Sequence, residues 1–279
     1  KIPPYTTLVG SGKDKTIIEQ TANSPIFVTV NGSSTVGNYD ETSGLSASNQ
    51  AKYISISGMT LRYENAVSNI YNTAIDLQSV EDGHFFDLKL KGYWDGDGIQ
   101  SNSIGINIKS FSGAVRSKRN LFENIDIEGF AYGVNSSFDI EDNTFRDITF
   151  STLLNGVRLG NNMPVVDYTD AADLADKLGD GVAYGPNNTL FENCTFKEVF
   201  EQGFIVNKGT ANTSKRNKYF DVGNAGGTSA TTTSSIIKFD TIGNETIEDW
   251  FERTYDLGYN QDYVNVTNVN SNNSNLDLD

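Results

Sequence analysis

The chain is made of short runs in which apolar and polar residues alternate, and one such run recurs along its length. Leu121–Ile127 and Leu190–Phe196 both begin Leu-Phe-Glu-Asn and continue with apolar residues at every second position, and Thr144–Phe150 has the same form. A Gly and a second short apolar alternation follow each run, as at Gly156–Leu159. Alternation with period two predicts β-strands, and a recurring pair of strands predicts rungs that stack on copies of themselves.

Weaker copies extend the repeat to Ile56–Leu61 and Phe85–Leu90 upstream and to Tyr219–Val222 downstream. We therefore expect one residue of each copy to occupy the same inward position on successive rungs, as part of a stacked ladder. The expected ladder is Ile56, Phe85, Phe122, Phe145, Phe191 and Tyr219. The identical segments Ser117–Asn120 and Ser214–Asn217 each end two residues before their ladder residue, which supports this alignment and predicts a tight corner at each Asn. Their Lys-Arg pairs fit a solvated corner, with a basic patch for an anionic partner as the alternative.

Helical character is confined to residues 170–178, where acidic residues come first and a Lys comes late, before a Gly. We expect this one short helix to project from the stack in a lateral loop, residues 161–186, with the coil resuming at Asn188. The strand rhythm ends near residue 245, because Trp250 and Phe251 are adjacent and a strand would expose one of them. The sequence thus predicts an all-β solenoid at 1–245 and a C-terminal cap or linker at 246–279, leading to a missing domain or a partner subunit.

The acidic balance of the chain limits its partners. It carries 36 Asp and Glu against 21 Lys and Arg, a formal net charge of −15, which disfavours nucleic acid and anionic membrane surfaces. No segment has the pattern of a signal peptide or a transmembrane span. The single cysteine, Cys194, predicts neither a disulfide framework nor a cysteine zinc site, and its place in an alternating strand predicts a small core residue. The chain starts at Lys1 without Met and ends in an Asn-rich stretch, so we expect further domains to flank it.

Ile2–Ile18 reads Ile-Pro-Pro-Tyr-Thr-Thr-Leu-Val-Gly-Ser-Gly-Lys-Asp-Lys-Thr-Ile-Ile and resembles the opening coil of the pectate-lyase-like superfamily. The Phe-Glu-Asn runs resemble later rungs of the same proteins, and the likeness covers about residues 1–245. This resemblance implies a right-handed single-stranded parallel β-helix with the short helix in its lateral loop. The abundance of Asn and Thr, the acidic charge and the single His are most similar to tail and tailspike proteins of tailed bacteriophages, which implies a place in the virion.

The resemblance to phage tail proteins implies a structural, receptor-facing domain of a tail fibre, tailspike or baseplate appendage. Its partners would be host cell-surface polysaccharide and other tail subunits, and a homotrimer is the usual arrangement of similar tailspikes. Two alternatives stay open. One is a tailspike-type polysaccharide hydrolase or lyase, and the other is a bacterial adhesin of the same fold.

Paired carboxylates would carry the enzyme alternative, since glycoside hydrolysis uses two of them about 5–9.5 Å apart. The candidates are Asp95 with Asp97, and Asp139 with Glu141 and Asp142. Asp95 and Asp97 alternate with glycines and could also hold Ca²⁺, the one cofactor that the sequence suggests, although the loop lacks the distal Glu of an EF-hand. The alternative, which we favour, is that the first pair lies in a plain loop turn and that Asp139–Asp142 forms a solvated corner.

Polygalacturonases of this superfamily resemble the chain weakly at Trp94–Ile99, but they need a Gly-His-Gly and a further Asp pair on following coils, and the only histidine here is His84. We interpret His84 as a turn residue before a strand, with a role as general base as the alternative. Tyr93 and Trp94 could stack on a sugar ring or cover the edge of a coil.

Overall fold

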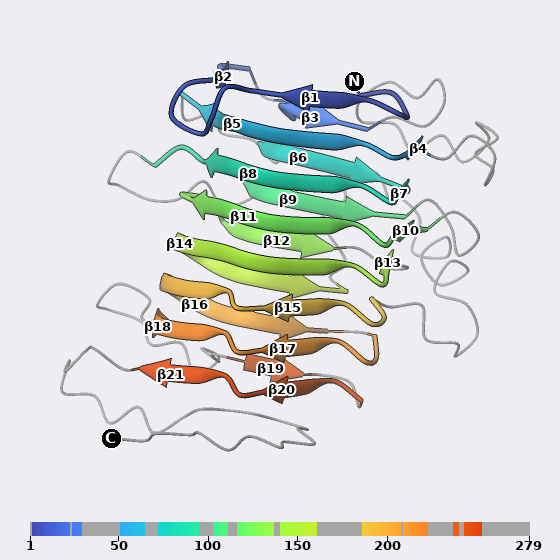
Figure 1. The fold of residues 1–279 in the computed structure, drawn as a ribbon. Helices are drawn as coiled ribbons and strands as arrows, with labels where there is room; N and C mark the ends of the chain where they lie inside the picture. Colours follow the sequence, from blue (N-terminus) through green and yellow to red (C-terminus); the bar gives the residue numbers. More distant parts are fainter. Residues whose placement is uncertain are drawn as a thin grey trace, which may run out of the picture.

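The protein has an all-β architecture of curled parallel sheets. The structure is a computed structural model that describes residues 2–22, 24–29, 51–64, 72–94, 103–110, 116–136, 140–160, 186–207, 209–222, 237–239 and 243–252. Across these ranges the chain forms 21 strands and no helix, and the strands make up one sheet of 17 strands and a second of four. Figure 1 shows the strands stacked layer upon layer, from β1 near the N-terminus to β21 near the C-terminus.

Three sets of strands repeat from layer to layer. The first set is β1 (Thr7–Val9), β2 (Ile17–Gln20), β5 (Ser55–Tyr63), β8 (His84–Lys91), β11 (Leu121–Glu128), the first half of β14 (Thr144–Leu159), β15 (Leu190–Glu192), the first half of β16 (Thr195–Val206), β17 (Thr213–Lys215), β18 (Lys218–Val222), β20 (Glu245–Ile247) and β21 (Trp250–Glu252). The second set is β3 (Phe27–Val28), β6 (Thr73–Gln78), β9 (Ile104–Lys109), β12 (Tyr132–Ser136), the second halves of β14 and β16, and β19 (Ile237–Phe239). The third set, the four-stranded sheet, is β4 (Ala51–Lys52), β7 (Val80–Glu81), β10 (Ser117–Lys118) and β13 (Ile140–Glu141).

The expected Phe ladder is confirmed from Ile56 to Phe191. The parallel register places Ile56 opposite Phe85, and Phe122 opposite both Phe85 and Phe145. All of these side chains are buried. The ring centroids of consecutive Phe residues lie 4.9, 4.5 and 4.3 Å apart from Phe85 to Phe191, with nearly parallel planes. Parallel strands lie about 4.8 Å apart, so flat rings at one register position stack at that spacing.

The place expected for Tyr219 was wrong. Ser214, and not Tyr219, lies opposite Phe191 on the next layer. Tyr219 instead pairs with Phe196 and belongs to a second buried stack, with ring centroids 4.5 Å apart from Phe196 and 4.6 Å between Phe196 and Phe150. The identical segments Ser117–Asn120 and Ser214–Asn217 therefore occupy different places in their layers, and the alignment drawn from them fails.

Left-handed residues turn the chain at repeated corners. In the first corner column, seven residues have φ between 51° and 58° and lie on successive layers: Tyr5, Tyr53, Asp82, Arg119, Asp142, Asn188 and Ala211. In the second corner column, Gly58 with φ of 68° is followed by Asp87, Asn124, Asp147, Asn193, Arg216 and Glu248, with φ between 51° and 55°. Asn and Asp adopt this geometry more readily than other side chains, which explains the recurring Phe-X-Asn and Phe-X-Asp. The Phe points inward, and the Asn or Asp two residues later makes the corner.

Buried asparagines link the layers beside the first corner column. The Oδ1 of Asn143 accepts hydrogen bonds from the backbone N and the Nδ2 of Asn120, at 3.1 and 2.9 Å. The Oδ1 of Asn244 does the same for Asn212, at 3.0 and 2.9 Å. These side chains satisfy backbone groups that the corners would otherwise leave unpaired in the interior.

The C-terminal boundary of the stack lies further along than expected. Strands β20 and β21 pair in parallel with β17 and β18, so the pairing continues past residue 245 to Glu252. Trp250 lies in a strand and is 50% exposed. We expected the chain to leave the strand conformation here so that Trp250 would not be exposed, and it does not. The cap or linker is otherwise untested, since 253–279 and the expected helix at 170–178 fall outside the described residues. None of the described segments forms a helix long and apolar enough to cross a membrane.

Candidate functional site

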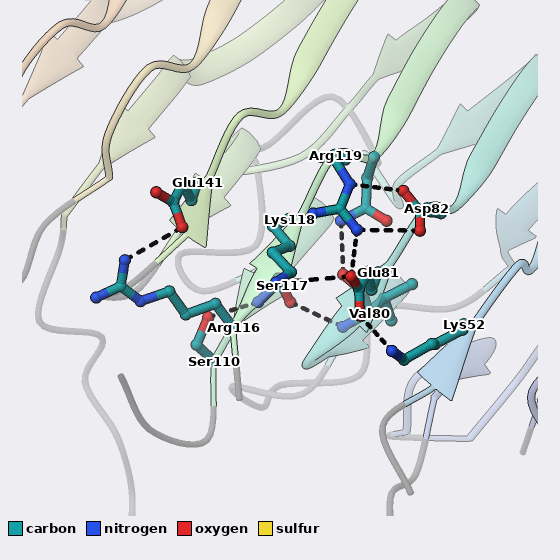
Figure 2. Close-up of polar contacts among 11 residues, drawn as sticks. Lys52, Val80, Glu81, Asp82, Ser110, Arg116, Ser117, Lys118, Arg119 and Glu141 are labelled. Atoms are coloured by element: carbon teal, nitrogen blue, oxygen red, sulfur yellow. Dashed lines mark hydrogen bonds and ion pairs between the residues drawn. The ribbon is translucent and has the colours of Figure 1, made fainter. Parts of the chain in front are cut away.

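Charged residues concentrate at the corner formed by the four-stranded sheet, where Glu81 of β7 is the central acid (Figure 2). Lys52 of β4 places its Nζ 2.7 Å from one carboxylate oxygen of Glu81. Lys118 and Arg119, one layer further on, approach the other oxygen, with Lys118 at 3.6 Å. The Glu81 side chain is only 10% exposed, so three cations surround a nearly buried carboxylate.

The cations hold Glu81 in its ionised form. Burial alone would raise the pKa of Glu81, but hydrogen bonds from Lys52 and Arg119 and the nearby charge of Lys118 lower it overall. Arg119 also donates two hydrogen bonds to the carboxylate of Asp82, of 2.8 Å from Nε and 3.1 Å from Nη2. The five side chains form an ion-pair network that joins three consecutive layers at one corner.

The corner continues toward Glu141, one of the residues expected to be catalytic. Arg116 donates to Glu141 at 3.2 Å, and the next residue, Asp142, accepts a hydrogen bond of 2.6 Å from Asn188. Glu141 thus takes part in the same kind of contact between layers as Glu81. Its expected partner Asp139 lies outside the described residues, so the pair has no measured separation.

Only some of the other expected site residues lie in the part of the chain that the structure describes. Asp95 and Asp97 lie outside the described residues, so their roles as carboxylate pair or Ca²⁺ ligands stay predictions. Tyr93 is partly buried against the hydrophobic core, whereas Trp94 is 49% exposed. His84 lies at the start of β8, stacked on Phe86 at 4.4 Å and with its Nε2 2.9 Å from Glu123. In the described part of the chain, no three His, Cys, Asp or Glu side chains are grouped as metal ligands would be.

In the last two described layers, buried polar side chains occupy inward positions that Phe and Ile hold in earlier layers. Ser214 donates to Asp249 and contacts the hydroxyl of Tyr219 at 2.8 Å, and the backbone N of Asn217 donates to Asp249 at 2.7 Å. Burial raises the pKa of Asp249 to about 7, although the bonds from Ser214 and Asn217 oppose the shift. Cys194, one layer earlier, is buried as expected, and burial raises the pKa of its thiol to about 12. This thiol is unreactive at neutral pH.

Two tyrosines at the N-terminal end of the charged corner were missed by the sequence reasoning. Tyr5 and Tyr53 are 74% and 55% exposed, and their ring centroids lie 5.5 Å apart. A regular offset could have located them, because each residue of the first corner column precedes its ladder position by three, as Tyr53 precedes Ile56 and Asp82 precedes Phe85. Only the correct register shows that these positions share one edge.

One solved structure is similar to the chain. No protein-family description and no curated protein matches the chain. A solved structure titled "Geobacillus virus E2 - ORF18" is similar over 88% of this chain at 15% sequence identity, with a TM-score of 0.37. The match covers 48% of that structure, so the chain spans about half the length of the phage protein.

Proposed function

We propose that the chain is a structural, glycan-contacting domain of a phage virion, in a tail fibre, tailspike or baseplate appendage. Its fold in this proposal is a right-handed single-stranded parallel β-helix of the pectate-lyase-like kind. The fold proposal is supported by the register, since the same three sets of strands recur from layer to layer with ladder residues opposite one another. The resemblance of Ile2–Ile18 and of the Phe-Glu-Asn runs also supports the fold, whereas the virion proposal rests on the likeness to phage tail proteins in the abundance of Asn and Thr, the acidic charge and the single His.

A scaffold role is supported by ion pairs that carboxylates of one layer make with cations of the next. Glu81 and Glu141 each pair with a cation of a neighbouring layer, as Asp82 does. Ion pairs and buried ladders that join one layer to the next resist local opening, because separating two layers breaks several contacts together. A stiff body with charged and aromatic residues along one edge suits contact with a neutral or cation-bridged glycan.

The proposal is tested by assaying retention and cleavage on the same bacterial polysaccharides. The chain is incubated with capsular and lipopolysaccharide preparations, and bound protein, reducing ends and the absorbance of unsaturated products are measured. We expect retention on at least one preparation, without release of reducing ends or unsaturated products. Cleavage that disappears in Asp97→Asn or Glu141→Gln would replace this proposal by the hydrolase or lyase alternative.

Assembly and origin need separate measurements. Light scattering distinguishes a homotrimer, as in similar tailspikes, from a monomer attached at a single site. Genes for tail proteins beside the gene of this chain would support the virion, and their absence would favour the bacterial adhesin.

A further inference from the structure

Tyr5 and Tyr53 form an exposed aromatic pair at the first corner column. Their rings are 5.5 Å apart at an angle of 32°, and they are 74% and 55% exposed. The ladder positions of the same two layers hold Leu8 and Ile56, and the ladder aromatics of the next two layers, Phe85 and Phe122, are fully buried. The following layers keep their ladder aromatics inside, whereas these two adjacent layers present Tyr rings to solvent.

The two exposed tyrosines also have an unusual backbone conformation. Tyr5 and Tyr53 have φ of 58° and 54°, a left-handed geometry that costs a residue other than Gly about 1–2 kcal/mol. Later positions of the column hold Asp, Asn, Arg or Ala, and a bulky aromatic residue there is an outlier. Residues held in sparsely populated backbone conformations cluster at functional sites, so the outlier supports a functional hypothesis.

The strained pair is also held rigidly. The backbone N of Tyr5 donates to the carbonyl of Lys52 at 2.8 Å, and the backbone N of Tyr53 donates to the carbonyl of Glu81 at 3.1 Å. A ring on a fixed backbone loses little freedom when it contacts a ligand, which favours binding.

Polar groups border the pair on the same edge. Lys52, next to Tyr53 in sequence, extends its Nζ to Glu81 and keeps 28% of its side chain exposed. Asp82 follows Tyr53 in the corner column and pairs with Arg119. Exposed aromatic rings beside hydrogen-bond donors and acceptors match a pyranose ring, which has a face of C–H groups and a rim of hydroxyls.

We propose that Tyr5 and Tyr53 form a stacking platform for pyranose rings of a cell-surface polysaccharide, with Lys52 and Asp82 at its polar rim. This proposal rests on the proposed function, because it assigns a position to the glycan contact. It assigns that contact to Tyr5 and Tyr53, at the N-terminal end of the stack, and not to Tyr93 and Trp94.

The test compares variants on a microarray of bacterial polysaccharides, followed by biolayer interferometry with the polysaccharide that the protein binds best. The double variant Tyr5→Gly with Tyr53→Gly removes both rings while suiting the left-handed backbone, so it keeps the fold. We expect it to bind at least about tenfold more weakly, as the loss of two stacking contacts implies. Tyr53→Phe keeps the ring face and should bind within about twofold of the unmodified chain. Trp250→Ala, which removes another half-exposed aromatic residue, is the matched control and should bind unchanged.

The outcomes separate this inference from the proposed function. Glycan binding that the double Gly variant retains overturns the Tyr platform and leaves the glycan-contacting role intact. No binding to any polysaccharide on the array overturns both. If the double Gly variant changes an oligomer into a monomer in light scattering, with glycan binding unaffected, the pair is a contact between copies and the platform is rejected. Thermal unfolding by circular dichroism verifies that each variant is folded.

Discussion

The neighbours Phe85 and Phe86 offer a sharp test of the register, because they lie on opposite faces of β8. Phe85 is fully buried and stacked on Phe122 at 4.9 Å. A buried Phe removes about 150–250 Å² from water, worth about 4–6 kcal/mol at ~25 cal/mol per Å². Alanine retains part of that burial, so Phe85→Ala should lower the free energy of unfolding by about 3–5 kcal/mol. Phe86 is half-buried on the outer face and stacks on His84 at 4.4 Å, so Phe86→Ala should cost less than about 1.5 kcal/mol.

The measurement is guanidinium unfolding followed by circular dichroism, with the denaturant slope compared between variants to verify that both unfold in the same way. The two substitutions remove the same atoms at adjacent positions, so each is the control for the other. Equal losses, or a larger loss for Phe86→Ala, would refute the register. A slip of one residue exchanges the two faces of a strand.

Three further predictions concern single residues. The pKa of Asp249 in the folded chain is about 7, above its ordinary value of 3.8, so the stability that this carboxyl contributes is present below about pH 4 and is lost as pH rises to 7. Asp249→Asn should therefore be more stable than the unmodified chain at pH 8 and lose the advantage at pH 4, and thermal unfolding at both values tests the sign. Ala211 has φ of 57°, so Ala211→Gly should relieve strain and raise the free energy of unfolding by about 0.5–1 kcal/mol in guanidinium, a result that an unchanged midpoint would contradict. Glu81→Gln should lower thermal stability, because it leaves Lys52 and Arg119 without their shared charge, and high salt should narrow the difference if the loss is electrostatic.

The recurring alternation of apolar residues was enough to predict the ladder from Ile56 to Phe191. Phe122 and Phe145 are 23 residues apart with no long insertion between them, and each begins the same run, so their stacking follows from the sequence. The Asn or Asp two residues later was also informative, since few other residues favour a left-handed corner.

The identical Ser-Lys-Arg-Asn segments misled the alignment for a physical reason. Arg119 and Arg216 both adopt left-handed geometry, with φ of 54° and 53°, and each is followed by a buried Asn. The same local structure therefore serves two different corners of the layer, and sequence identity alone does not distinguish them. The substitution of Ser214 for Phe at the ladder position hid the correct alignment, because the stack changes there from rings to a polar group.

The exposed pair Tyr5 and Tyr53 could not be recognised from composition, because Tyr at a corner and Tyr in a strand look the same in the sequence. The two rings are exposed because both residues lie in the first corner column. That position follows from the three-residue offset between each Tyr and its ladder residue, Leu8 or Ile56. The expected carboxylates posed the opposite difficulty. Glu141 lies in β13, next to the corner at Asp142, and its pairing with Arg116 depends on contacts between layers that the sequence does not encode locally.

One register of parallel strands positions the ladder, the corners and the tyrosine pair, and distances between spin labels on the outer face measure it directly. Lys89, Asp126, Thr149, Thr195, Lys218 and Trp250 follow one another on successive layers. Labels at Lys89 and Lys218, four steps apart, should give a distance near 19 Å at about 4.8 Å per step, and labels at Lys89 and Trp250 should give about 24 Å. A Cys194→Ser background removes the native thiol. Electron–electron resonance distances that increase by about 5 Å between the two pairs would agree with the stacked layers. Distances that are equal, or that decrease toward Trp250, would contradict them.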